Sequence, residues 1–139
     1  MTRIIKRMDD EHLTKTLEEL DGERWEPSEY DSHVVRESHR LRSVPIGELS
    51  VEDLRLLLGQ NFGTEWLIPL ALARLVDDPL AEGDFYPGDL LESVLGTDAA
   101  YWASHPDEVV ALWGVTESLR ELRETADRFL ADERWPPFG

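Results

Sequence analysis

The chain has 139 residues, a formal net charge of −16 and no cysteine. At this length we expect one folded domain over residues 1–139 with a buried core of its own. The lack of cysteine excludes disulfides, thiolate nucleophiles and cysteine-ligated zinc, and the acidic excess argues against binding to nucleic-acid phosphates. No stretch approaches about 18 consecutive apolar residues, and the N-terminus lacks an apolar signal region, so we expect a cytoplasmic protein that does not enter membranes.

The first part of the chain predicts two short helices. Residues 10–20 carry leucines at helical spacing, and Gly22 follows as a stop signal. Residues 31–41 carry a second apolar stripe, which must end before Pro45 because proline disfavours helix in the residue that precedes it.

A capping box marks the start of the next helix. Ser50 is followed three residues later by Asp53, and the helix that they open ends at Gly59 or Gly63. The following segment, residues 64–76, is apolar on nearly every side, so we expect it to be the central buried helix.

Pro69 lies in that apolar segment and should either kink the helix or set its first turn. Residues 77–88 contain two prolines and two glycines and predict an ordered loop, which a short helix over residues 89–95 follows. The last long helix is expected over about residues 107–130. Because no segment alternates with a period of two, the fold class is predicted as all-α, a bundle of about six helices around residues 64–76.

The aromatic residues divide into two groups. Three tryptophans fall on apolar stripes and are expected in the core: Trp66, Trp102 and Trp113. Three aromatic residues lie near prolines and could be exposed anchors for a partner: Trp25, Trp135 and Phe138.

The sequence contains no pattern that requires an enzyme. His33 and Glu37 share a helix face, but His39 does not, so we interpret the three as a solvated surface and predict no metal site. No nucleophile elbow and no phosphate-binding glycine loop is present, so no catalytic residue and no cofactor is predicted. A small basic cluster between His33 and Arg42 is expected to pair with carboxylates of the same chain or to lie in water.

The strongest feature of the composition is an acidic stretch without any positive charge. No lysine or arginine occurs between Arg74 and Arg120. This stretch favours a basic protein as the partner. Nine of its ten acids are the candidate partner-binding residues: Asp77, Asp78, Glu82, Asp84, Asp89, Glu92, Asp98, Asp107 and Glu108.

Several motifs that occur together resemble one known family. They are Tyr-Asp-Ser-His-Val-Val-Arg at residues 30–36, Leu-Ile-Pro-Leu-Ala-Leu at 67–72, and Pro-Leu-Ala-Glu-Gly-Asp-Phe-Tyr-Pro-Gly-Asp-Leu-Leu at 79–91. In order and spacing they are similar to the immunity proteins of contact-dependent growth inhibition (CDI) systems. The resemblance covers about residues 30–95.

The resemblance implies a cytoplasmic protein, not an enzyme, that binds the C-terminal toxin domain of a cognate effector. Such toxins are frequently nucleases, and occlusion of the toxin's active site is the expected mode of inhibition. We expect a monomer that binds neither membranes nor nucleic acid directly. A regulatory module unrelated to toxins is the alternative.

The resemblance and the charge disagree about residues 83–91. Immunity proteins of one family face different toxins, so a shared motif should mainly encode the fold. The acidic stretch, however, includes this segment and favours a role in contact with the toxin.

Overall fold

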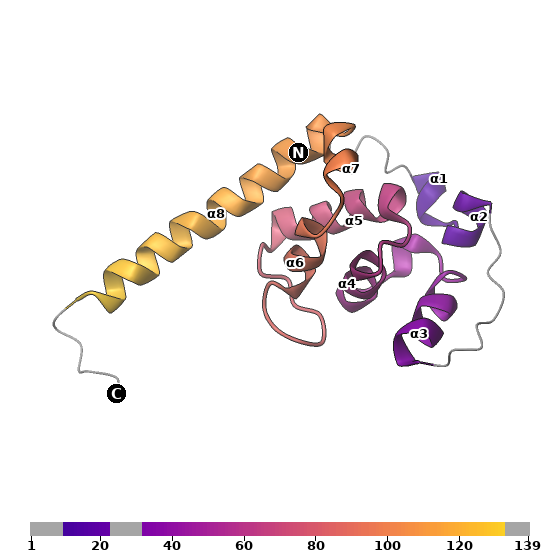
Figure 1. Ribbon diagram of the computed structural model, residues 1–139, viewed down its shortest axis with the longest axis horizontal. Coiled ribbons are helices and arrows are strands. Elements are labelled where there is room, and N and C mark those ends of the chain that lie inside the picture. The colour runs from indigo at the N-terminus through magenta and orange to yellow at the C-terminus, as the bar shows by residue number, and fades with distance from the viewer. Residues whose placement is uncertain (1–9, 23–31, 133–139) are drawn as a thin grey trace.

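The computed structural model describes residues 10–22 and 32–132, and within these ranges it contains helices, turns and loops but no strand (Figure 1). The predicted all-α class is therefore confirmed. In chain order the elements are α1 (Asp10–Leu13), α2 (Leu17–Asp21), α3 (His33–Leu41), the short 3-10 helix η2 (Ile46–Glu48), α4 (Val51–Gly59), α5 (Thr64–Asp77), α6 (Asp89–Leu95), α7 (Ala99–Ala103) and α8 (Pro106–Leu130).

The segment predicted as one helix over residues 10–20 is two short helices instead. Thr16 adopts an extended conformation between them, and its side chain accepts a hydrogen bond from the amide of Glu19. The carboxylate of Glu19 accepts a hydrogen bond from the Thr16 amide in return, which completes a capping box. This local cap begins a new helix where the spacing of the leucines alone indicated continuity, and Gly22 ends it as predicted.

The start of α4 agrees with the sequence. Ser50 and Asp53 form the predicted capping box, and α4 ends at Gly59. α5 begins at Thr64, and Gly63 takes the capping position with a positive φ. Pro69 lies inside α5 and not in its first turn.

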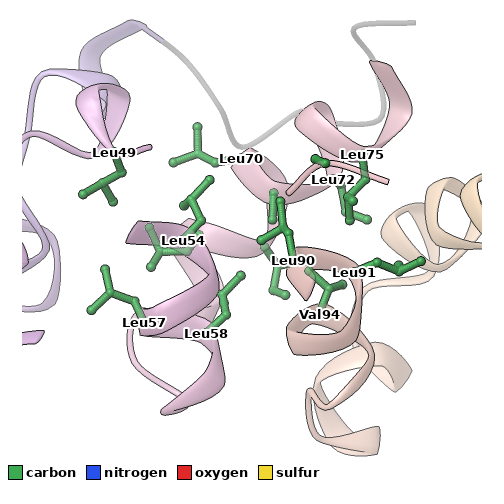
Figure 2. Packing of buried hydrophobic residues seen from close by; sticks show 14 of the residues in the cluster. Leu49, Leu54, Leu57, Leu58, Leu70, Leu72, Leu75, Leu90, Leu91 and Val94 are labelled. Atoms are coloured by element: carbon green, nitrogen blue, oxygen red, sulfur yellow. The ribbon is translucent and has the colours of Figure 1, made fainter. Parts of the chain in front are cut away.

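The core is built mainly from leucines of α4, α5 and α6. Figure 2 shows these side chains pointing toward one another from the three helices. As predicted, α5 is buried along most of its length, since residues 67–72 and Leu75 are all buried. α4 shares the central position, because it packs against α3, α5 and α6.

The long C-terminal helix is present, but only its first part packs on the core. Ala111, Leu112 and Val115 are buried, and this part contacts α5 and α7. From residue 120 to the end of the helix every residue is exposed, and Figure 1 shows this half of α8 extending away from the other helices.

The prediction that Trp113 lies in the core is wrong, because its side chain is 72% exposed. Successive residues on a helix point about 100° apart, so Trp113 cannot share the core-facing stripe of its buried neighbour Leu112. Trp66 and Trp102 are partly buried and pack against the core. The candidate anchors Trp25, Trp135 and Phe138 lie outside the described residues.

Two arginines of the basic cluster pair with carboxylates of the same chain, as predicted. Arg40 forms an ion pair with Glu37 at 2.6 Å. Arg42 is buried and forms an ion pair with Asp21 at 3.3 Å, which ties α3 to α2. Within the described residues no group of histidines and carboxylates could hold a metal ion.

Candidate functional site

A surface groove lies between the turn that follows α4 and the chain from residue 85 to Tyr101. It consists of two pockets with volumes of about 380 and 540 Å³. The pockets adjoin, because Asn61 and Gly96 line both of them. Asn61 has a φ of 61°, a left-handed conformation that asparagine tolerates better than most residues. This turn brings the chain back from α4 into α5 and forms one wall of the groove.

The buried carboxylate of Asp89 organises the opposite wall. It accepts hydrogen bonds from the amides of Gly83 at 2.7 Å, Phe85 at 3.1 Å and Tyr86 at 3.4 Å. Asp89 is also the first residue of α6, where a negative charge is favoured by the helix dipole. Burial acts to raise the pKa of Asp89, but the three amide hydrogen bonds outweigh it and hold the pKa below its ordinary value. The loop between α5 and α6, residues 78–88, is therefore fixed through its backbone.

A second carboxylate, on α4, holds the same loop from the other side. Arg55 donates two hydrogen bonds to the carboxylate of Glu52, one from Nε and one from Nη2, each at 2.6 Å. Glu52 also accepts a hydrogen bond from the amide of Asp84 at 2.9 Å. The hydrogen bonds from Arg55 are the main cause of a lowered pKa of Glu52, and the Asp84 amide adds to them against the opposing effect of burial.

Arg55 joins the two carboxylates into one network. Its Nε lies 3.9 Å from Oδ2 of Asp89, and its guanidinium carbon lies 4.4 Å from the centre of the Phe85 ring. We call Glu52, Arg55 and Asp89, with the loop amides that they hold, the loop network. It connects α4, the loop and the start of α6.

Gly83 is required where the loop passes Glu52. A Cβ atom added at this position would overlap the carboxylate of Glu52 and would lie 3.2 Å from the carboxylate of Asp89. Because Arg55 and a loop amide fix the carboxylate of Glu52, it cannot simply move aside. The motif glycine therefore permits a close approach between backbone and carboxylate.

The network leaves two aromatic side chains on the surface. Phe85 is 66% exposed and Tyr86 is 46% exposed, although the loop network holds their backbone amides. The Tyr86 hydroxyl donates a hydrogen bond to Glu92 of α6, which raises the pKa of Tyr86 above its ordinary value. Both aromatic residues and Glu92 line the first pocket, and Asp98 lines the second.

The structure separates the candidate acids into two kinds. Asp89 and Glu108 are buried, and Glu108 accepts hydrogen bonds from the Tyr101 hydroxyl at 2.8 and 3.1 Å. The others are exposed, and we call them the acidic surface: Asp77, Asp78, Glu82, Asp84, Glu92, Asp98 and Asp107. Of these, Glu92 and Asp98 line the groove, and Glu82 and Asp84 lie in the loop beside it.

Four residues of this site are not among the candidate residues that the sequence predicts: Glu52, Arg55, Phe85 and Tyr86. Glu52 and Arg55 lie three residues apart on α4, a spacing that indicates an ion pair but not a contact with a distant loop. Phe85 and Tyr86 were noted only as part of the family motif. Two adjacent aromatic residues inside a loop without core periodicity could have indicated exposed side chains.

Exposed aromatic side chains on a fixed loop are a feature that surfaces binding other proteins share. A model of the family described as CDI immunity proteins matches residues 19–112. This match covers more than half of the chain, so the chain belongs to the family of CDI immunity proteins. Comparison with curated proteins and with solved structures found no significant match.

Membership of the family defines the general role. The chain is an immunity protein that neutralises the toxin of a CDI system, and its partner is the cognate CDI toxin. Proteins of this family are generally not enzymes. Among the described residues, no helix combines the length and the apolar character that crossing a bilayer requires.

Proposed function

We propose that the chain acts in the cytoplasm as a monomer and inhibits a nuclease toxin by covering its active site with the acidic surface. A nuclease holds phosphates, so its substrate-binding surface is basic. Carboxylates of the immunity protein would occupy the positions that phosphates of the substrate take. The observation that carries this proposal is the acidic surface, whose seven acids are exposed and lie in a stretch with no lysine or arginine between Arg74 and Arg120.

The charge distribution supports rapid recognition of such a toxin. A molecule with a net charge of −16 attracts a basic partner over distances of about 10 Å at moderate ionic strength. Complementary charge mainly raises the association rate and excludes wrong partners. We therefore expect association to slow steeply as salt is added.

The first experiment tests the partner and its activity. The chain is co-expressed with the toxin domain of its own CDI system, the complex is purified, and the free toxin is assayed on RNA and DNA. We expect a stable complex, cell survival and cleavage of nucleic acid that the chain suppresses. A toxin that binds the chain but cleaves neither nucleic acid would contradict the nuclease assignment.

The second experiment tests occlusion. A catalytically inactive toxin variant is mixed with labelled nucleic acid, and the chain is added at increasing concentration. Occlusion predicts that the chain displaces the nucleic acid in direct competition. A ternary complex of toxin, nucleic acid and immunity protein would show that inhibition does not operate by covering the substrate site.

The third experiment assigns the interface to the acidic surface. The double variant Asp84→Lys and Asp98→Lys reverses two exposed acids of this surface, and the matched control Glu121→Lys and Glu124→Lys reverses two exposed acids on the outer half of α8. Both changes alter the net charge equally. We expect the first variant to lower the association rate at low salt by about tenfold or more, and the control to lower it much less. Equal losses would mean that only the total charge matters.

A further inference from the structure

We infer that the groove is the anchor of the toxin interface and that it receives a basic segment of the toxin, with an arginine placed against Tyr86 and Glu92. This inference rests on the proposed binding of a basic toxin. Beyond that proposal, it names the part of the surface that contributes most of the affinity. It also names the type of toxin side chain that enters this part.

The first argument is the rigidity of the exposed aromatic residues. Phe85 and Tyr86 leave 66% and 46% of their surface in solvent, yet their amides are bonded to a buried carboxylate. Large aromatic side chains near the centre of an interface contribute more binding free energy than most other residues. A backbone that is already ordered before binding loses less conformational entropy when the complex forms.

The second argument is the charge that remains in the groove. Arg55 is matched by the carboxylate of Glu52, and the carboxylate of Asp89 is matched by loop amides. No ion pair joins Glu92 or Asp98 to another residue in the described part of the chain. The groove therefore keeps two carboxylates without a cation, one in each pocket.

The third argument concerns which cation fits. The Tyr86 hydroxyl donates a hydrogen bond to Glu92, so a carboxylate lies at the edge of an exposed ring. A guanidinium group can stack on an aromatic ring and donate to a carboxylate at the same time, because it is planar and carries several N–H donors. The ammonium group of lysine can make either contact, but it is not planar and cannot stack on the ring while it donates to the carboxylate. Arginine is therefore the side chain that this arrangement favours.

The fourth argument is the size of the groove. The two pockets, of about 380 and 540 Å³, continue past Asn61 and Gly96 and are longer than one side chain needs. Gly96 also leaves room for a backbone to approach. The groove is suited to a loop or extended segment that places basic side chains at both Glu92 and Asp98.

The test compares exposed aromatic residues in two places. Phe85→Ala and Tyr86→Ala remove aromatic rings from the groove, and Trp113→Ala removes a ring that is 72% exposed on α8. Dissociation constants for the wild-type chain and each variant are measured by calorimetry with the cognate toxin domain, and circular dichroism confirms that each variant is folded. We expect each groove variant to weaken binding by about 30-fold or more, and Trp113→Ala by less than about threefold.

A double-mutant cycle then tests the predicted arginine. Each arginine of the toxin is replaced by lysine, and each replacement is combined with Glu92→Gln in the immunity protein. For one arginine, replacement by lysine should lower the affinity of the toxin for the wild-type chain at least about fivefold. The same replacement should lower the affinity for the Glu92→Gln variant much less. Tyr86→Phe, which keeps the ring and removes the hydroxyl, should lose less affinity than Tyr86→Ala.

The outcomes separate this inference from the proposed function. If the wild-type chain binds and protects but the groove variants bind as tightly as Trp113→Ala, the groove is not the anchor and the inference fails alone. If no toxin arginine couples to Glu92, the predicted chemistry is wrong. If the wild-type chain does not bind its toxin at all, the proposed function fails as well.

Discussion

Two regions of this molecule expose apolar side chains, and they differ in how the backbone beneath those side chains is held. In the loop before α6, Phe85 and Tyr86 are exposed on a backbone that the buried carboxylate of Asp89 and the partly buried carboxylate of Glu52 fix from two sides. In the outer half of α8, Leu122 and Leu130 are 53% and 68% exposed on a helix that extends away from the core. The family match includes the loop and ends at residue 112, before the outer half begins. Exposure alone therefore does not identify a binding surface, whereas exposure on a fixed backbone is a stronger sign of one.

The largest effect on stability is expected from Asp89→Ala. This change leaves three loop amides and Arg55 without the buried carboxylate that they contact. Loss of hydrogen bonds to a buried charge should lower the free energy of unfolding by about 3 kcal/mol. Urea denaturation measures the loss, with the exposed Asp84→Ala as the control, for which we expect a change within about 0.5 kcal/mol. A similar loss in both variants would mean that the loop network is not what stabilises this region.

Two glycine substitutions should change stability in opposite directions. Gly83→Ala forces a Cβ atom against the carboxylate of Glu52 and should cost about 1–2 kcal/mol. Gly114→Ala places a Cβ atom in open space on α8, where alanine is a better helix former, and should raise the free energy of unfolding by up to about 1 kcal/mol. Thermal unfolding of the two variants distinguishes these cases. An unchanged midpoint for Gly83→Ala would show that the loop can move aside without cost.

Acidification should release the loop. The pKa values of Asp89 and Glu52 are lowered in the folded chain, so the stability that these groups contribute is present above the ordinary carboxyl pKa of about 4. It is lost as the pH falls through the folded-state pKa values. The amide chemical shifts of Gly83 and Phe85, followed by NMR from pH 7 downward, should titrate below pH 4. The same amides in Asp89→Asn should lose the part of this titration that Asp89 causes.

The smallest effect is expected in the outer half of α8. Leu122→Ala removes an exposed side chain and should change the free energy of unfolding by less than about 0.5 kcal/mol. Leu112→Ala, on the buried part of the same helix, should cost about 2–3 kcal/mol. Chemical denaturation of both variants tests the difference. A loss above about 1 kcal/mol for Leu122→Ala would indicate that this side chain packs against something in solution.

The sequence predicted those features that local chemistry determines. The capping box of Ser50 and Asp53, the end of α2 at Gly22 and the buried α5 follow from residues that lie next to one another. The break at Thr16 agrees with the capping-box spacing of Thr16 and Glu19, but the spacing of the leucines indicates one continuous helix. In α8 the apolar stripe indicated which side of the helix is apolar. It could not show that the outer half of this side stays exposed, with no described residue covering it.

The site was less predictable, because it depends on contacts between distant parts of the chain. The charge pattern placed Asp84 and Asp89 in one group, although one is exposed and the other is buried. The hydrogen bond from the Asp84 amide to Glu52 joins residues 32 positions apart. Neither periodicity nor composition contains information about such a contact. The acidic stretch therefore indicated a surface but not which of its carboxylates support the fold.

The loop before α6 is held mainly through its backbone and not through its side chains. Glu52 and Asp89 hold the segment through backbone amides, whereas Arg55 contacts the side chain of Phe85. A change of side chain at Asp84 or Tyr86 would therefore alter the exposed surface without removing a hydrogen bond that holds the loop backbone.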